Sequence, residues 1–279
     1  MVPRAHLACW ITRSQPAKLD EPRGKRANFC AMGGIDDRHR FDRAAASFDA
    51  ADFVHATTRD GLFARMGPMN LDARTIIDLG SATGSSAQQL SKTFRRRTVI
   101  PVDLSHAMLK RAVSRSSWFA KTPAVQADAG LLPFVDHSID LVFANLLLPW
   151  IRDRERVFSE VARVLSENGL FVFSTLGPDS LRGLRHGGFA DMHDVGDELV
   201  RAGLLDPVLD VDRLTVTYKD AQSLDQDLKA IGATDCLPEE PESLDVELEL
   251  VYGHCWGRGT TSLKGEVRID PGQISRRKV

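Results

Sequence analysis

Short apolar runs alternate with segments of helical pattern between residue 75 and residue 176. Five short runs rich in β-branched and aromatic residues have Gly, Pro or Asp at their ends, as buried strands do. Between these runs, apolar residues recur every three or four positions, which is typical of helices that cover a sheet. Strand alternating with helix predicts an α/β fold with a doubly wound, mostly parallel sheet and right-handed crossovers. The predicted strands are 75–80, 98–103, 123–128, 138–145 and 169–176, and the predicted helices are 85–94, 105–115 and 154–165.

The chain before residue 75 shows two other patterns. Residues 38–66 are Ala-rich and place Phe41, Phe48 and Leu62 within helical sequence, so we expect two helices there. Residues 1–35 carry scattered Arg and Lys, three prolines and little periodicity, which predicts a disordered leader, with a transit peptide as the alternative. The chain therefore divides into a leader (1–35), a helical region (36–72) and a sheet domain (73–279).

The composition is that of an ordinary globular protein, with 43% apolar residues, 27% charged residues and a net charge of -2. A nearly neutral chain has no general attraction for nucleic acid. No apolar run approaches the ~20 residues that a membrane-spanning helix needs. The four cysteines form no C-x-x-C pair and no cluster with His, which predicts neither a metal site nor a disulfide framework. These features predict a cytoplasmic protein with no nucleic-acid or membrane partner.

Polar side chains stand at the carboxyl ends of four predicted strands, where ligands bind in a doubly wound sheet. The first strand runs into a loop in which Gly80 and Gly84 permit positive φ and a close backbone approach. The helix after this loop presents free N–H groups to a polar ligand. The second strand ends in Asp103, whose carboxylate can accept hydrogen bonds from two ribose hydroxyls. The third ends in Asp128 and the fourth in Asn145; helix capping is the alternative role for the two aspartates.

The glycine spacing separates two classes of cofactor. The dinucleotide fingerprint G-x-G-x-x-G needs Gly at positions 82 and 85, where this chain has Ala82 and Ser85, so the spacing argues against NAD. Asp78, Gly80 and Gly84 instead form D-x-G-x-x-x-G, which resembles the S-adenosylmethionine-binding motif of class I methyltransferases. The Cβ of Ala82 is the one feature of this loop expected to crowd such a ligand.

This resemblance implies a role for the residue at each strand end. The loop wraps the methionine part of the cofactor, Asp103 binds the ribose, Asp128 and Ala129 face the adenine with Met108 nearby, and Asn145 closes the site beneath the sulfonium. The implied cofactor-binding residues are Asp78, Gly80, Ser81, Ala82, Thr83, Gly84, Asp103, Leu104, Met108, Asp128, Ala129 and Asn145.

Longer stretches narrow the family. FDRAAASFDAA (41–51), DLSHAMLKRA (103–112), most of 132–220 and LELVYGHCWG (248–257) together resemble the malonyl-acyl-carrier-protein O-methyltransferases of biotin synthesis. The resemblance implies a Rossmann-like sheet of seven strands with an N-terminal helical lid and an antiparallel last strand at about 246–255. It also implies methyl transfer from S-adenosylmethionine to the free carboxylate of a malonyl thioester on acyl carrier protein.

The implied chemistry needs no general base, because a carboxyl group with an ordinary pKa near ~4 is already ionised at neutral pH. Positioning can then supply the rate. Arg152, Arg182 and Arg185 are candidates for the group that holds the substrate carboxylate, and solvated surface arginines are the alternative interpretation. Arg201 joins Arg182 and Arg185 as a candidate for contact with an acidic carrier protein. Phe48 stands where the family has Tyr in its lid helix.

His193, His254, Trp150 and Trp256 invite functional roles that the pattern does not favour. His193 stands at a predicted helix start and His254 in a predicted strand, so we expect capping and packing. The tryptophans lack an accompanying basic groove, so we expect them in the core or a pocket wall.

Two connecting segments, one after Arg185 and one after Asp235, are shorter than those expected from the resemblance to the family. Such segments normally cover the site and shape the substrate channel. A degenerate or repurposed S-adenosylmethionine-binding paralogue is therefore an alternative, as is an arginine hydroxylase of the type that acts on a complex I subunit.

Overall fold

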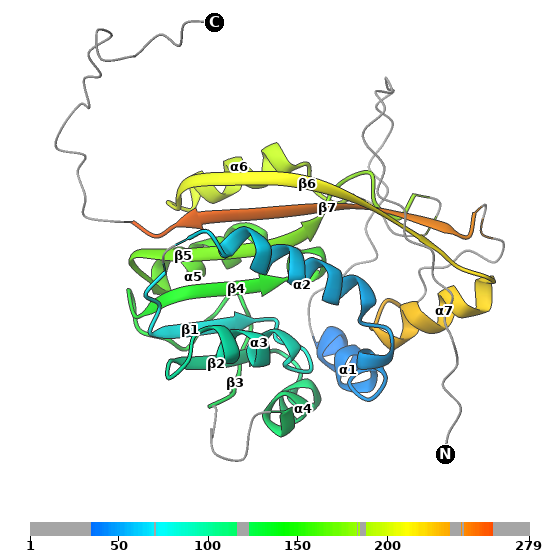
Figure 1. The fold of residues 1–279 in the computed structure, drawn as a ribbon, viewed down its shortest axis with the longest axis horizontal. Coiled ribbons are helices and arrows are strands. Elements are labelled where there is room, and N and C mark those ends of the chain that lie inside the picture. The colour runs from blue at the N-terminus through cyan, green and yellow to red at the C-terminus, as the bar shows by residue number, and fades with distance from the viewer. Residues whose placement is uncertain are drawn as a thin grey trace, which may run out of the picture.

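The computed structural model describes residues 35–69, 71–115, 123–182, 184, 188–234, 241 and 243–258. These residues contain a seven-stranded sheet with helices packed on its two faces (Figure 1). The strand order is β3-β2-β1-β4-β5-β7-β6, so the chain reverses its direction of winding between β1 and β4. The strands are β1 (Thr75–Leu79), β2 (Thr98–Asp103), β3 (Val125–Gln126), β4 (Ile139–Asn145), β5 (Leu165–Leu176), β6 (Leu205–Thr217) and β7 (Asp245–Trp256).

The five predicted strands are confirmed, and two of them, β3 and β5, differ from the predicted bounds by more than one residue. β3 keeps only its two central residues, Val125 and Gln126. β5 begins at Leu165, four residues earlier than predicted, because Leu165 pairs with Ile139 of β4 and is fully buried. β7 is antiparallel to both β5 and β6, which confirms the expected reversal of the last strand.

The predicted helices are also confirmed. Two precede the sheet and the others connect its strands, with two single 3₁₀ turns at its carboxyl edge. The helices are α1 (Ile35–Ala44), α2 (Phe53–Met66), α3 (Ser85–Thr93), α4 (His106–Arg115), α5 (Arg154–Val164), α6 (Met192–Arg201) and α7 (Ala221–Ala230), and the 3₁₀ turns are η1 (Phe48–Ala50) and η2 (Leu148–Trp150). The predicted leader lies outside the described residues except for its last residue, and the division of the chain at residue 73 stays a prediction.

The central strands are apolar on both sides because helices cover both faces. On one face, Ile76 of β1 and Phe143 of β4 join a cluster with Leu62 of α2. On the other face, Ile77 of β1 joins a cluster with Phe158 of α5. Adjacent residues of a strand point to opposite faces, so the near-continuous apolar runs supply two cores at once.

Helix α2 crosses one face of the sheet and packs against β7 at a glycine (Figure 1). A Cβ on Gly61 would lie 2.6 Å from the Oη of Tyr252, so this approach needs a residue with no side chain. One turn later, the Arg65 guanidinium lies 3.7 Å from the centroid of the Tyr252 ring and pairs with Asp210 of β6 at 2.6 Å. This packing brings the start of α2 to the carboxyl edge of the sheet, where the backbone of His55 meets β4.

The contact at Gly61 predicts a destabilising Gly61→Ala substitution. Alanine favours a helix over glycine by about 1 kcal/mol, but overpacking against the buried Tyr252 costs roughly 1–3 kcal/mol, so we expect a net loss. Gly196 of α6 is the matched control, because its added Cβ would meet Leu209 at an ordinary 3.6 Å. Urea denaturation should show Gly196→Ala stabilised and Gly61→Ala destabilised; equal effects would contradict the packing argument.

Candidate active site

The loop after β1 holds three residues with positive φ: Gly80 (72°), Ala82 (45°) and Gly84 (86°). A Cβ on Gly80 would lie 2.9 Å from the Leu147 side chain, and one on Gly84 would lie 2.6 Å from Ala112, so both positions require glycine. Ala82 adopts the left-handed region despite its Cβ, at a cost of roughly 1–2 kcal/mol. The residues on either side of Ala82 therefore impose this conformation on it, although Ala82 is not a glycine.

A cavity of about 250 Å³ opens beside this loop, at the carboxyl ends of β1, β2 and β4. We call it the cofactor cavity. It lies at the point where the strand order reverses, as doubly wound folds predict. Nine of the predicted site residues line it: Gly80, Ala82, Asp103, Leu104, Met108, Asp128, Ala129, Asn145 and Arg152. The other cofactor candidates near the loop, Asp78, Ser81, Thr83 and Gly84, are not among its lining residues.

Asp103 faces the cofactor cavity with both carboxylate oxygens already bonded to the backbone. Its Oδ2 accepts a hydrogen bond from the N–H of Ala82 at 2.9 Å, and its Oδ1 accepts one from Ser105 at 2.8 Å. Burial raises the pKa of Asp103 to about 6 against these hydrogen bonds. Each carboxylate oxygen has two lone pairs, so the group can still accept two hydroxyl donors from a ligand.

Asp78 in β1 and Ser81 in the loop both have unmet hydrogen-bonding capacity. Asp78 Oδ2 and Ser81 Oγ are buried and have no hydrogen-bond partner among the described residues. Burial raises the pKa of Asp78 to about 7, and the nearby Asp103 carboxylate acts in the same direction. A cationic ligand group or an ordered water at this place would satisfy such acceptors.

Asn145 joins three elements at the end of β4. Its Nδ2 donates to the carbonyl oxygen of His55 in α2 at 2.9 Å, and its Oδ1 accepts from the Ser174 hydroxyl of β5 at 2.9 Å. The next residue, Leu146, has a φ of 51°, and its N–H donates to Ser174 Oγ at 2.9 Å. This strained turn directs the chain into η2, whose Trp150 forms part of the cavity wall.

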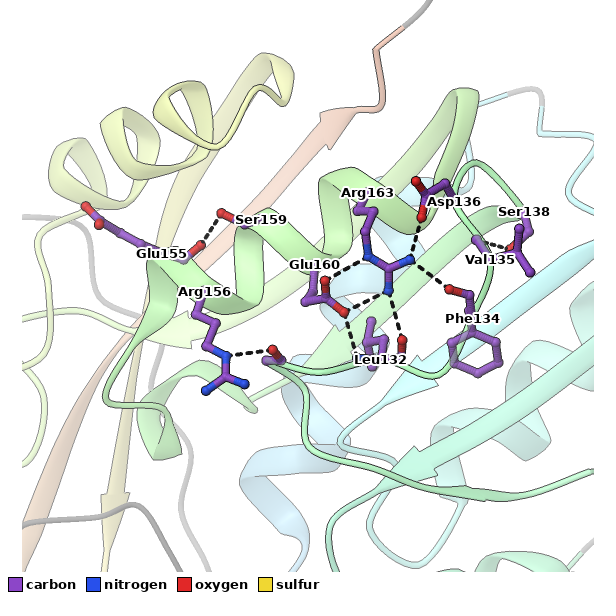
Figure 2. Close-up of polar contacts among 11 residues, drawn as sticks. Leu132, Phe134, Val135, Asp136, Ser138, Glu155, Arg156, Ser159, Glu160 and Arg163 are labelled. Carbon is purple, nitrogen blue, oxygen red and sulfur yellow. Dashed lines mark hydrogen bonds and ion pairs between the residues drawn. The ribbon is translucent and has the colours of Figure 1, made fainter.

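The loop after β3 is held in place by α5 (Figure 2). The carboxylate of Asp128 accepts from the N–H of Gly130 at 2.8 Å, and the carbonyl of Gly130 accepts from Arg156 Nε at 2.8 Å. Arg163 pairs with Glu160 and Asp136 and also donates to the carbonyls of Leu132 and Phe134. These bonds fix the Asp128–Gly130 wall of the cofactor cavity.

The N-terminal helices cover the cofactor cavity and bond to the elements that form it. Asp42 of α1 accepts from the Ser105 hydroxyl at 2.6 Å and from the N–H of Ala107 at 3.0 Å. Asp49 of η1 accepts from the Thr83 hydroxyl and pairs with arginines of α4. Burial raises the pKa of Asp49, but the Thr83 and arginine hydrogen bonds outweigh it, so the pKa lies below its usual range. The predicted lid therefore contacts the cofactor loop directly.

The three candidate arginines differ in position. Arg152 lines the cofactor cavity and makes no hydrogen bond or ion pair with a residue that the structure describes. Arg182 is 69% exposed, pairs with Asp179, and is not a lining residue of the cavity. Asp179 also pairs with Arg213 at 2.7 Å. Arg185 lies outside the described residues.

Sequence reasoning missed His55, Asp42 and Asp49, although Phe48 was singled out. Phe48 is 6% exposed, lines the cofactor cavity and packs edge-on against the His55 ring at 4.9 Å. The cap of α6 is Asp191 and not His193: the Asp191 carboxylate accepts from the N–H and from the exposed ring of His193. Only the helical spacing of 53–66 could have drawn attention to His55.

Within the described residues there is no group of three or more His, Cys, Asp or Glu side chains placed to hold a metal ion. No helix in the described part of the chain has the length and apolar character to cross a bilayer.

Comparison with known proteins identifies the family. A family model described as a methyltransferase domain matches residues 77–173. A malonyl-[acyl-carrier protein] O-methyltransferase from Halorhodospira halophila is 35% identical to this chain over 280 residues, covering 86% of the chain and 95% of that protein. The chain belongs to the malonyl-acyl-carrier-protein O-methyltransferase family. A family member from Gallionella capsiferriformans is 37% identical over 258 residues, covering 78% of the chain and 89% of that protein.

Solved structures agree on the fold of this family member. A phosphoethanolamine N-methyltransferase from Haemonchus contortus, bound to S-adenosylhomocysteine, superposes with a TM-score of 0.58 at 17% identity over 81% of this chain and 61% of that one. A methyltransferase from Bacillus halodurans gives a TM-score of 0.57 at 15% identity, over 72% of this chain and 99% of that one. At these identities the likeness establishes the class I methyltransferase fold.

Removing the carboxyl of Asp78 should change how stability depends on pH. Its pKa of about 7, raised from 3.8, means that its contribution to stability is full below pH 3.8 and is lost as the pH rises through about 7. Asp78→Asn removes that loss, so the unfolding free energy of the variant relative to wild type should rise from about pH 5 to about pH 8. Urea denaturation across this range measures the difference. The exposed Asp206→Asn is the control, and a pH-independent difference for Asp78→Asn would contradict the buried-carboxyl assignment.

Proposed function

We propose that this protein transfers a methyl group from S-adenosylmethionine to the free carboxylate of malonyl-acyl carrier protein, forming a methyl ester early in biotin synthesis. The observation that carries the proposal is the similarity to malonyl-acyl-carrier-protein O-methyltransferases along most of both chains, which extends well beyond residues 77–173 matched by the methyltransferase domain model. The cofactor cavity beside the glycine loop supports it independently.

The residues present fit S-adenosylmethionine. Gly80 and the small side chain of Ala82 leave room beside the loop, and Asp103 retains lone pairs for the two ribose hydroxyls. Asp78 does not line the cofactor cavity, so its unmet Oδ2 suits the cationic amino group of the methionine part through a bridging water. Ala129 and the Gly130 backbone, held by Arg156, provide a flat wall for the adenine.

Methyl transfer to a carboxylate needs orientation more than acid–base chemistry. When bound, the cofactor supplies an electrophilic methyl group on sulfur: the carboxylate oxygen forms a bond to the methyl carbon while the methyl–sulfur bond breaks, and its electron pair stays on sulfur. No proton is transferred, so no general base is required. The contribution of this chain is to hold the carboxylate near the cofactor cavity and to exclude water, which Phe48, Met108 and Trp150 do as apolar wall residues.

The carrier protein is proposed to dock near the lid and the segment after β5. Acyl carrier protein is acidic, so cationic side chains should face it. Arg182 and Arg201 are exposed at 69% and 62% and stay candidates for this contact. A cytoplasmic location stays a prediction from the cysteine pattern.

A cofactor-binding paralogue without this activity is the second candidate. Ala82 favours it, because this residue carries a Cβ at the cavity in a strained conformation, and so does the expectation from the family resemblance that Phe48 replaces a Tyr. The alignment with the Halorhodospira protein runs over 280 residues but takes in 86% of this 279-residue chain, so that relative has positions that this chain lacks.

The direct test is the intact mass of malonyl-acyl carrier protein after incubation with the purified protein and S-adenosylmethionine. We expect a gain of one methyl group that requires the cofactor and is absent with acetyl-acyl carrier protein. A reaction with a relative of established activity serves as the positive control. No mass gain, with S-adenosylhomocysteine still bound in calorimetry, would favour the inactive paralogue.

Asp103→Ala should weaken S-adenosylhomocysteine binding by at least about 1 kcal/mol, because two hydroxyl acceptors are lost. Asp103→Asn keeps one acceptor oxygen, so its affinity should lie between those of Asp103→Ala and wild type. Isothermal titration calorimetry gives the affinities. Circular dichroism checks that each variant still folds without the full set of hydrogen bonds from the Ala82 and Ser105 backbone to Asp103. An unchanged dissociation constant for Asp103→Ala would remove Asp103 from the ribose site.

A further inference from the structure

A second cavity, of about 110 Å³, adjoins the cofactor cavity. His55, Leu146 and Trp150 line both cavities and form the boundary between them. Most of the remaining wall is apolar. It comes from several elements, among them α7 and the adjacent ends of β6 and β7, with Leu228 and Leu248 as examples. We call this space the apolar chamber.

The apolar chamber has an acidic side chain in its wall but no Lys or Arg among its described lining residues. The ionisable side chains among these residues are His55, Tyr218 and Asp227. Burial raises the pKa of Asp227, and a hydrogen bond from Tyr218 acts against this rise. An anionic group placed in the chamber would meet apolar walls and a carboxyl group without a compensating cation. The chamber therefore suits an uncharged ligand segment.

His55 is held at the boundary through its backbone while its ring stays available. Asn145 bonds to its carbonyl oxygen, and Phe48 packs against the ring. The ring Nδ1 is buried and has no hydrogen-bond partner among the described residues. Burial lowers the pKa of His55 to about 4, with Arg59 acting in the same direction, so the ring is neutral at physiological pH. A neutral imidazole carries one N–H donor, whichever nitrogen holds the proton.

We propose that the apolar chamber receives the thioester end of the malonyl group, and that the imidazole of His55 donates a hydrogen bond to the carboxylate that is methylated. The proposal deepens the function proposed above and rests on it. A malonyl thioester carries one carboxylate and one uncharged end. The boundary at His55 separates the two ends: the carboxylate faces the cofactor cavity and the methylene and thioester enter the chamber.

A neutral donor suits this reaction better than a cation in direct contact. Carboxylate and sulfonium charges both disappear as the ester forms, so a contact that strongly stabilises the carboxylate charge favours the ground state over the transition state. His55 can orient the oxygen without that penalty. Arg152 is the rival, since it is the candidate arginine that lines the cofactor cavity, but it does not line the apolar chamber.

The test compares two non-hydrolysable ligands that differ only in the carboxylate: the amide analogues of malonyl-pantetheine and acetyl-pantetheine. Calorimetry with the full chain saturated with S-adenosylhomocysteine gives their affinities. Wild type should prefer the malonyl analogue by roughly 10- to 100-fold, because a hydrogen bond to a charged group is involved. His55→Phe should abolish the preference. His55→Asn and His55→Gln place an amide N–H near the two ring nitrogen positions, and at least one should restore much of it.

These binding measurements test the role of His55 without requiring the protein to be catalytically active. Unchanged S-adenosylhomocysteine affinity in the His55 variants shows that the cofactor cavity is intact, and the exposed His193→Phe is the matched control. A preference that survives in His55→Phe, is lost more fully in Arg152→Gln, or is absent from wild type overturns the role of His55. A His55-dependent preference in a protein that fails the mass test would overturn the proposed methyl transfer and leave only the role of His55 in binding the carboxylate.

Free malonate tests the apolar chamber. Its second carboxylate would meet Asp227, so wild type should bind it at least about tenfold more weakly than the malonyl analogue. Asp227→Asn should bind free malonate several-fold more tightly than wild type, while its affinity for the acetyl analogue changes less than about twofold. Equal malonate affinity in the two proteins would show that the far end of the ligand does not reach Asp227 and would overturn this assignment.

Discussion

The side chain of Asn145 makes the interaction on which the geometry of the site depends. Its amide joins the backbone of α2 to the carboxyl end of β4, and its carbonyl oxygen accepts from Ser174 of β5. Both ends of the amide are therefore used within the protein. The start of α2 is held at the switch point of the sheet, where His55 lines a cavity on each side.

The packing of α2 supports the same arrangement from the other end. Gly61 lets the helix approach Tyr252, and Arg65 covers the Tyr252 ring while pairing with Asp210 of β6. Because β7 lies between β5 and β6, this contact ties the lid helix to the antiparallel part of the sheet. The lid is thus anchored at both ends of α2, and the first turn of the helix contributes Val54 and His55 to the cavity walls.

The electrostatics of the two cavities are complementary. Asp78 and Asp103, both with raised pKa values, lie on the cofactor side, where a cationic ligand would favour their ionised forms. The boundary carries a neutral His55, and the apolar chamber carries Asp227 without a cation among its described residues. A cationic cofactor and a ligand with a single carboxylate are the pair that this distribution accommodates.

The sequence pattern by itself determined β1 to β5, the helices α1 to α5 and the strand-end residues, because hydrophobic periodicity and glycine spacing are local properties of the chain. It placed Asp103, Asp128 and Asn145 at one edge of the sheet, and the structure brings all three to one cavity. It did not find His55, because the bond to Asn145 spans 90 positions and the helix pattern around residue 55 is ordinary in isolation. Nor could it choose among the arginines: Arg152 and Arg182 look alike in sequence, and only the folded chain turns one toward the cavity and pairs the other with Asp179. Local patterns set which segments become strands and helices, whereas contacts between distant segments decide which side chains share a cavity.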